Sequence, residues 1–433
     1  MPLVSANDIE NWASTIDARY KMGELIRRLI FEGIPYLSIK NIRFLSGETT
    51  QSTGWDGILE CNSQALYIPD GLSLWEIGTG EDAKEKIKKD FETRKGSEIP
   101  LGLAHNNITY VAVTPRKLND LVSLENELKL NSPWKDVKIF DATNLEEWVQ
   151  CSTNAQTWLQ EQNIGQPLSI MTIERHWKVW SNETIPSIST NLLLNGREKL
   201  TSEFISLIKK PFNIRLKADS PDEAIAYIFA VVNSIDQQNF KDSFFSKTLI
   251  ISKAEDAEKF RDCNYNHNII LTSHAGEKSQ LLLDKGHSVI NITTNSSHIL
   301  NSPFDINIGR LLRRNFIEAL VAMGQSQRDA EIETQVCGAS VSVWRIWKKL
   351  KNACVSSSLP EWAKPENATL LIPAILIGSW CETKDGDLSI IKEITGMDYE
   401  VYQNSIDKFL YIDNPPIQRI DNIWRVVAPA VSF

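Results

Sequence analysis

The sequence has no apolar run that approaches the roughly 20 residues a helix needs to span a bilayer. Its first residues, MPLVSANDIENWAS, lack the basic and apolar regions of a signal peptide. The six cysteines are scattered, without a CxxC pair and without histidines at zinc-ligand spacing, so we interpret them as reduced core residues. We therefore expect a cytoplasmic protein with no membrane segment and no zinc site.

Motifs for two common kinds of chemistry are also missing. No glycine-rich loop ends in Gly-Lys-Ser/Thr, and the residues that follow an expected strand at 212–216 read Lys-Ala-Asp-Ser-Pro-Asp-Glu, a helix cap rather than a phosphate loop. No Gly-x-Ser-x-Gly motif and no Cys-His arrangement supports a covalent hydrolase. We expect neither ATP hydrolysis nor covalent catalysis.

The chain does contain enough apolar material for two or three globular cores, since 42% of its 433 residues are hydrophobic. Its formal net charge is −9 at pH 7. Phosphate binding depends on clustered Lys and Arg, so this charge excludes indiscriminate wrapping of nucleic acid. Any contact with DNA has to use a local basic patch.

Hydrophobic periodicity divides the chain into four stretches. Residues 1–165 combine helices and short strands, which predicts a mixed α/β domain, and residues 166–186 read as a Trp-rich linker. Residues 187–309 alternate strands, the first at 191–194, with helices, as in a parallel, doubly wound α/β sheet. Residues 310–433 carry mainly helical patterns and predict an α-helical domain. The strands expected in the first domain lie at 39–44, 57–61, 73–77, 108–114 and 137–141.

Two acids stand at the ends of neighbouring short strands, Asp56 in Gly-Trp-Asp-Gly and Glu76 in Ser-Leu-Trp-Glu-Ile-Gly-Thr. Paired carboxylates are the usual protein ligands of the hard cation in metal-dependent phosphodiester cleavage. The ordinary alternative is that Asp56 forms a turn and Glu76 is a surface charge at a strand end. The apolar neighbours of Glu76 favour a site, because an unpaired buried carboxylate is costly.

A lysine-rich helix is expected at 81–95. In it, Lys86, Asp90 and Arg94 are separated by four residues each and so share one face. A lysine on that face would orient the attacking water or stabilise negative charge in the transition state. The sequence supports equally well an ordinary exposed helix, in which these residues form ion pairs between positions four apart.

The order of helix acid, Asp, Glu and Lys resembles the PD-(D/E)xK, or restriction-endonuclease-like, superfamily. More narrowly, ELIRRLI, GWDG, IPDGLSLWEIGT, KIKKDFETRK, VAVTPR and WKDVKIFDATNLEEWV resemble the N-terminal domain of large NTPase-linked proteins of bacterial antiphage defence. This similarity covers about residues 18–165, and WKVWS, LLLNGR and ADSPDEAIAYIFA resemble the continuation of those proteins. The resemblance implies a restriction-endonuclease-like mixed-sheet domain, then a degenerate parallel α/β NTPase-like domain, then an α-helical domain.

Carried over to this chain, the resemblance makes Glu24 the helix acid, Asp56 and Glu76 the ligands of Mg²⁺ or Mn²⁺, and Lys86 the basic catalytic residue. The superfamily places its lysine two residues after the acid, where this chain has Gly78. The resemblance therefore implies that Lys86 replaces the missing lysine from the following helix.

Three further cations of the same helix are expected to serve the site. Lys84 and Lys89 are the reserve candidates for the displaced lysine. Together with Arg94 they form the expected contact with nucleic acid.

Two functional classes follow. The first is a metal-dependent DNA endonuclease of antiphage defence, activated by assembly into a homo-oligomer, by a partner defence protein or by a foreign trigger. The second is a catalytically inactive scaffold that binds nucleic acid or a partner protein and oligomerises, which Gly78 and the missing phosphate loop favour. Metal binding distinguishes the two classes.

Overall fold

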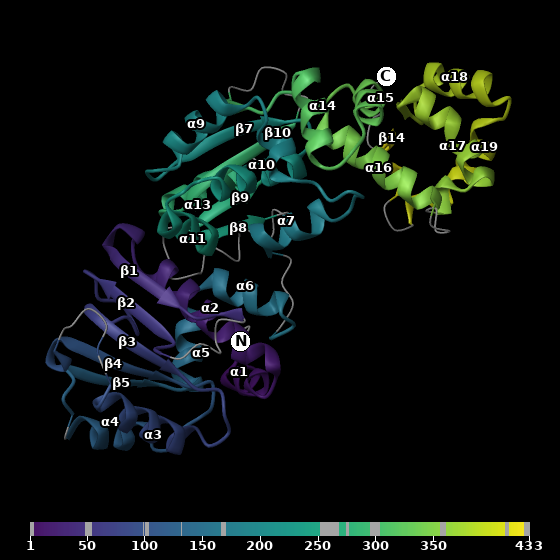
Figure 1. Cartoon of the computed structure of the whole chain (residues 1–433). Helices are drawn as coiled ribbons and strands as arrows, with labels where there is room; N and C mark the ends of the chain where they lie inside the picture. Colours follow the sequence, from purple (N-terminus) through teal and green to yellow (C-terminus); the bar gives the residue numbers. More distant parts are fainter. Residues whose placement is uncertain are drawn as a thin grey trace. The chain divides into compact units, whose positions relative to one another are not determined.

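The computed structural model describes residues 4–47, 54–97, 99, 104–130, 132–165, 170–251, 268–273, 277–294, 304–355, 361–411 and 415–427. These residues form a mixed α/β fold, as expected (Figure 1). The chain divides into two compact units: Met1–Trp180 with Arg197–Gly309, and Ser181–Gly196 with Arg310–Phe433. Both α/β sheets belong to the first unit. The two α/β domains expected at 1–165 and 187–309 therefore do not form separate compact units.

The first sheet has the strand order β1-β2-β3-β4-β5 and contains all five strands that the sequence predicts for residues 1–165. Strands β1 to β3 are antiparallel, and β3 to β5 are parallel. The elements of this region are α1 Ala6–Ala13, α2 Ile16–Gly33, β1 Ile39–Phe44, β2 Gly57–Cys61, β3 Gly71–Ile77, α3 Ala83–Lys95, β4 Ile108–Val113, α4 Leu121–Leu130, β5 Asp136–Phe140, α5 Ala142–Gln150 and α6 Thr153–Glu161.

Both faces of this sheet are covered by helices, which is why β4 is buried along its whole length. On one face, Val111 and Trp75 pack with α2, α5 and α6. On the other, Leu74 and Tyr110 pack with Ile87 of α3 and with α4. The helices α3 and α4 lie side by side next to this sheet (Figure 1). The helix α3 is therefore held against the sheet by its apolar side, which contains Ile87 and Phe91.

The second sheet has the strand order β11-β7-β10-β9-β8-β6, parallel except for β6 at one edge. Ser220 caps the helix after β7 and Pro221 occupies its first turn, which confirms the predicted cap. The alternation of strands and helices in the sequence also predicts a helix at 254–261, which lies outside the described residues. The elements are β6 Ile170–Thr172, α7 Ile173–Ser181, α9 Glu198–Leu207, β7 Asn213–Ala218, α10 Pro221–Asn233, α11 Gln238–Lys247, β8 Thr248–Ile251, β9 Ile269–Thr272, α13 Glu277–Asp284, β10 Ser288–Thr294 and β11 Ile306–Asn307.

Two expectations for the chain around this sheet are wrong. The stretch 166–186 is not simply a linker, because β6 pairs with β8 and α7 carries the tryptophans. Trp177 stacks on Phe229 with ring centroids 4.9 Å apart, so its role is packing. Residues 191–194 form the helix α8 (Thr190–Leu194) instead of a strand. A short apolar run cannot by periodicity alone be assigned to a strand or a buried helix.

The second unit contains helices as predicted, but an all-helical domain is wrong. Strands β12, β14 and β13 form an antiparallel sheet in that order, and Trp380 stacks on Trp424 with centroids 5.6 Å apart. These strands have three or four residues each, too few to show a period of two. The elements are α8, α14 Arg313–Ala322, α15 Gln327–Cys337, α16 Val341–Val355, α17 Pro365–Ile377, β12 Ser379–Cys381, α18 Asp385–Thr395, α19 Tyr399–Ile406, β13 Ile417–Ile420 and β14 Ile423–Val426.

No helix in the described part of the chain has the length and apolar character required to cross a membrane.

Candidate functional site

The pairing of β2 with β3 brings the two predicted metal ligands together. Gly57 is paired with Trp75 in this antiparallel ladder, so continuing the register by one residue sets Asp56 opposite Glu76. Residues directly opposite each other on antiparallel strands project from the same face. A backbone contact fixes the pair further, because the Ile77 N–H donates to Asp56 Oδ2 at 2.8 Å.

Both acids line a cavity of about 550 Å³ at the end of β3. Lys86 lines the same cavity, so the structure brings together three of the four residues expected to be catalytic. The remaining lining residues come from α2, from the segment after β1, from the last position of β3 and from the loop between β3 and α3: Arg19, Gly23, Leu45, Ile77, Gly78, Thr79, Gly80, Glu81 and Asp82.

Lys86 reaches this cavity beside the position where the superfamily motif has its lysine. A Cβ atom placed on Gly78 would lie 3.5 Å from Lys86 Cγ, so the lysine stem packs over the bare glycine. The Lys86 ammonium donates to Asp90 Oδ1 at 2.6 Å. The spacing of four residues predicts this ion pair. The sequence pattern did not indicate that the Asp90 carboxylate holds the catalytic candidate Lys86 in place.

Arg94 is tied into the site and is not a free cation at the surface. Its Nε lies 2.6 Å from Glu76 Oε1, its Nη2 donates to the Gly54 carbonyl, and its guanidinium lies over the Trp55 ring, 4.6 Å from the centroid. Glu76 is only 7% exposed, so this pair satisfies a buried carboxylate. We therefore reassign Arg94 from a nucleic-acid contact to a residue that positions Glu76.

The other two predicted nucleic-acid contacts differ from each other. Lys84 forms an ion pair with Asp120. Lys89 is exposed on α3. Neither residue lines the cavity, so neither is needed to replace the motif lysine there.

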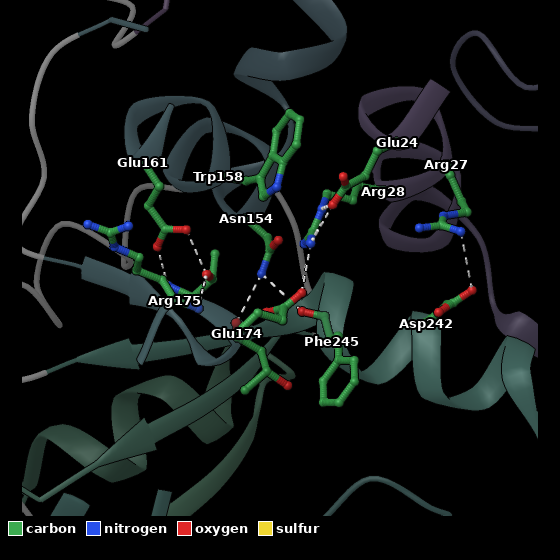
Figure 2. A network of polar contacts seen from close by, with 12 residues as sticks. Glu24, Arg27, Arg28, Asn154, Trp158, Glu161, Glu174, Arg175, Asp242 and Phe245 are labelled. Atoms are coloured by element: carbon green, nitrogen blue, oxygen red, sulfur yellow. Dashed lines mark hydrogen bonds and ion pairs between the residues drawn. The ribbon is translucent and has the colours of Figure 1, made fainter. Parts of the chain in front are cut away.

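Glu24 lies in a different cluster from the one expected. Its Oε1 is 3.0 Å from Arg28 Nη2, and the same nitrogen is 2.7 Å from Glu174 Oε1 (Figure 2). Glu24 is absent from the residues that line the cavity, where α2 contributes Arg19 and Gly23. Successive helical residues are rotated by 100°, so Glu24 and Gly23 face different directions. We leave Glu24 out of the site.

The electrostatics of the acid pair reflect burial and mutual repulsion. Burial raises the pKa of Asp56, against the stabilising effects of the Ile77 N–H and of Lys86. Burial, together with the negative charge of Asp56, raises the pKa of Glu76 to about 7, although Arg94 acts in the opposite direction. Burial and the repulsion between the two acids therefore favour the protonated form of Glu76 more than in a solvent-exposed carboxyl.

Such a pair fits a hard divalent cation, which binds oxygen ligands and would relieve the repulsion. Asp56 and Glu76 would hold the ion, with the remaining positions open to water or to substrate. Within the described residues, no group of three or more His, Cys, Asp and Glu side chains is arranged to hold a metal. Among the described residues, the oxygen donors of the acid pair are the carboxylates of Asp56 and Glu76.

Comparison with protein-family models gives no match, and neither does comparison with curated proteins. The case for this site accordingly depends on its own geometry: two acids brought together by strand register, a lysine supplied by the next helix, and a cavity that all three line.

Proposed function

We propose that this chain is a metal-dependent DNA endonuclease of bacterial antiphage defence. In this proposal the first sheet and its helices are a restriction-endonuclease-like domain, and the second sheet is a degenerate NTPase-like module. The observation that carries the proposal is that Asp56, Glu76 and Lys86 line one cavity. The motif resemblance supplies the reaction class and the setting.

Each residue has a definite part in the proposed reaction. Asp56 and Glu76 bind Mg²⁺ or Mn²⁺, and Arg94 holds the Glu76 carboxylate in position. The bound cation supplies Lewis-acid stabilisation of charge on the phosphate. Lys86, held by Asp90, orients the attacking water or stabilises the charge that develops on a phosphate oxygen.

Activation by assembly, by a partner defence protein or by a foreign trigger belongs to the same proposal, because a nuclease that is always active would damage its host. The expected result is that cleavage appears together with a rise in oligomer mass or with a phage product. Cleavage that is independent of both would contradict this part of the proposal.

The test is cleavage of supercoiled plasmid and of single-stranded DNA with Mg²⁺ or Mn²⁺. Glu76→Gln and Lys86→Met should both abolish cutting. Lys84→Met is the matched control, since Lys84 lies two residues away on the same helix and pairs with Asp120. If Lys84→Met abolished cutting and Lys86→Met did not, Lys84 would be the residue that replaces the missing motif lysine.

One observation favours a second candidate, a catalytically inactive scaffold that binds nucleic acid or a partner protein. Glu76 and Lys86 already have ion-pair partners, Arg94 and Asp90, within the chain. These pairs neutralise groups that a nuclease would use. Calorimetry separates the candidates, because the scaffold requires no Mg²⁺ or Mn²⁺ binding at Asp56 and Glu76.

A further inference from the structure

Arg19 is a cation at the candidate site that sequence reasoning did not identify. It lies on α2, is exposed, and lines the cavity together with Asp56 and Glu76. In the described part of the chain its guanidinium has no hydrogen-bond or ion-pair partner. Lys86, the other cation that lines the cavity, is paired with Asp90. Arg19 is therefore the lining cation whose charge is still available to a ligand.

The placement of Arg19 is set by close packing of α2. Arg19 and Gly23 are four residues apart and share a helix face. A Cβ atom on Gly23 would lie 2.0 Å from the Leu45 carbonyl oxygen, so the helix backbone lies directly against residue 45. The Leu45 N–H in turn donates to the Asp56 carbonyl at 2.8 Å. The helix that carries Arg19 is thus fixed against the strand end that carries Asp56.

The charge balance of the cavity shows what such a cation is needed for. The lining contains four carboxylates, those of Asp56, Glu76, Glu81 and Asp82, against the two cations Arg19 and Lys86. A phosphodiester is an anion, and this lining repels it unless positive charge faces it directly. A guanidinium binds phosphate oxygens through two parallel N–H donors, which a lysine cannot do.

We propose that Arg19 binds a non-bridging oxygen of the substrate's phosphodiester backbone at this cavity. The inference rests on the proposed nuclease function and deepens it, since α2 then supplies a phosphate-binding cation where the resemblance implied an acid. The contact is made to the backbone, so it acts on every nucleic-acid sequence alike.

The test compares Arg19→Gln and Arg19→Lys with Lys21→Gln in the full chain. Lys21 is a matched control, because it lies on the same helix but binds Asp17 at 2.8 Å and Gln162 at 2.7 Å. Fluorescence anisotropy with a labelled DNA duplex in Ca²⁺ measures binding, and plasmid cleavage in Mg²⁺ gives KM and kcat. Thermal melting followed by circular dichroism checks that the three variants fold like wild type.

Arg19→Gln should weaken DNA binding about tenfold, the lower range for a lost charge-assisted hydrogen bond. The slope of log affinity against log salt should fall by about 0.9, the value for one phosphate contact. KM should rise with little change in kcat, and Arg19→Lys should recover part of the affinity. Lys21→Gln should behave like wild type.

Two results overturn the inference in different ways. If wild type binds and cuts DNA and Arg19→Gln matches Lys21→Gln in affinity, salt slope and KM, then Arg19 does not bind the backbone, while the nuclease proposal stands. If wild type neither binds nor cuts DNA in any metal, both the inference and the proposed function fail.

Discussion

Arg94 Nε lies 2.6 Å from Glu76 Oε1, and the same guanidinium donates to the Gly54 carbonyl and covers the Trp55 ring. One side chain of α3 thereby connects the end of β3 with the segment that leads to Asp56. Its planar fork makes these contacts simultaneously, which fixes the orientation of a carboxylate proposed to bind metal.

Replacing Arg94 by methionine should therefore destabilise the protein and disorder the site. We expect a loss of about 2 kcal/mol in the free energy of unfolding. The loss is smaller than for a buried charge left unpaired, because the Glu76 carboxyl can take up a proton once Arg94 is absent. Lysine at this position should recover only part of the loss. Urea unfolding measures the effect, and Lys95→Met is the control, because Lys95 pairs with Glu92 on the same helix. A loss of the same size in the control would contradict the assignment.

Metal binding should release protons near neutral pH. The pKa of Glu76 is raised to about 7, so below that pH the carboxyl is largely protonated and must lose its proton to bind a cation. Affinity for Mn²⁺ should consequently fall as the pH drops from 8 to 6. Calorimetry in buffers of different ionisation enthalpy counts the protons released.

Two variants test whether this binding occurs at the acid pair. Glu76→Gln should reduce the Mn²⁺ affinity at least about tenfold, and Asp56→Asn should do the same, since each removes a charged ligand. Asp120→Asn is the control, because Asp120 pairs with Lys84 away from the cavity. Equal Mn²⁺ affinities in all three variants would exclude the site.

The catalytic lysine should function from residue 78, just after β3, as well as from residue 86 on α3. A side chain at residue 78 would begin 3.5 Å from Lys86 Cγ, which is ordinary van der Waals contact. Gly78→Lys combined with Lys86→Ala should therefore recover cleavage that Lys86→Ala alone loses. The rate of plasmid nicking measures this recovery, and Gly80→Lys with Lys86→Ala is the control. Recovery in the control as well would mean that any nearby cation suffices.

Glu32 should make stability depend on pH. Burial raises its pKa to about 7, while the Ser152 hydroxyl that donates to its Oε2 acts in the opposite direction. The folded protein therefore holds a proton that the unfolded chain releases above about pH 4.5. The contribution of Glu32 to stability accordingly falls as the pH rises from about 4.5 to 7, and it stays low at higher pH.

Glu32→Gln removes this dependence. Relative to wild type, the variant should gain up to about 3 kcal/mol in unfolding free energy between pH 5 and pH 8. Urea unfolding of both proteins at the two pH values measures the difference. Since Glu76 is present in both proteins, its own titration cancels. A wild-type-to-variant difference that is the same at both pH values would contradict the prediction.

Gly23 should not tolerate a methyl group. A Cβ atom there would lie 2.0 Å from the Leu45 carbonyl oxygen, and a backbone atom cannot move aside as a flexible side chain does. Gly23→Ala should cost about 3 kcal/mol or more of stability. Gly80→Ala is the control, since nothing lies within 4 Å of its Cβ position. Thermal melting of the two variants measures the contrast, and equal melting temperatures would refute it.

The sequence by itself determined the five strands of the first sheet, the lysine-rich helix α3 and the choice of the acid pair. Short extended or apolar runs between turn residues mark β1 to β5, and Asp56 and Glu76 stand out because a charge occurs at the end of such a run. The same periodicity failed at residues 191–194 and in the short strands β12 to β14, where too few residues are present to show a period.

Only the tertiary structure decided which charges face the cavity. Glu24 and Arg19 lie on the same helix, but packing of Gly23 against residue 45 turns Arg19 to the cavity, while Glu24 pairs with Arg28. Arg94 likewise changed from an expected DNA contact to the partner of Glu76. Sequence spacing fixes which residues share a helix face, but the rotation of that face toward its neighbours depends on packing between elements that are distant along the chain.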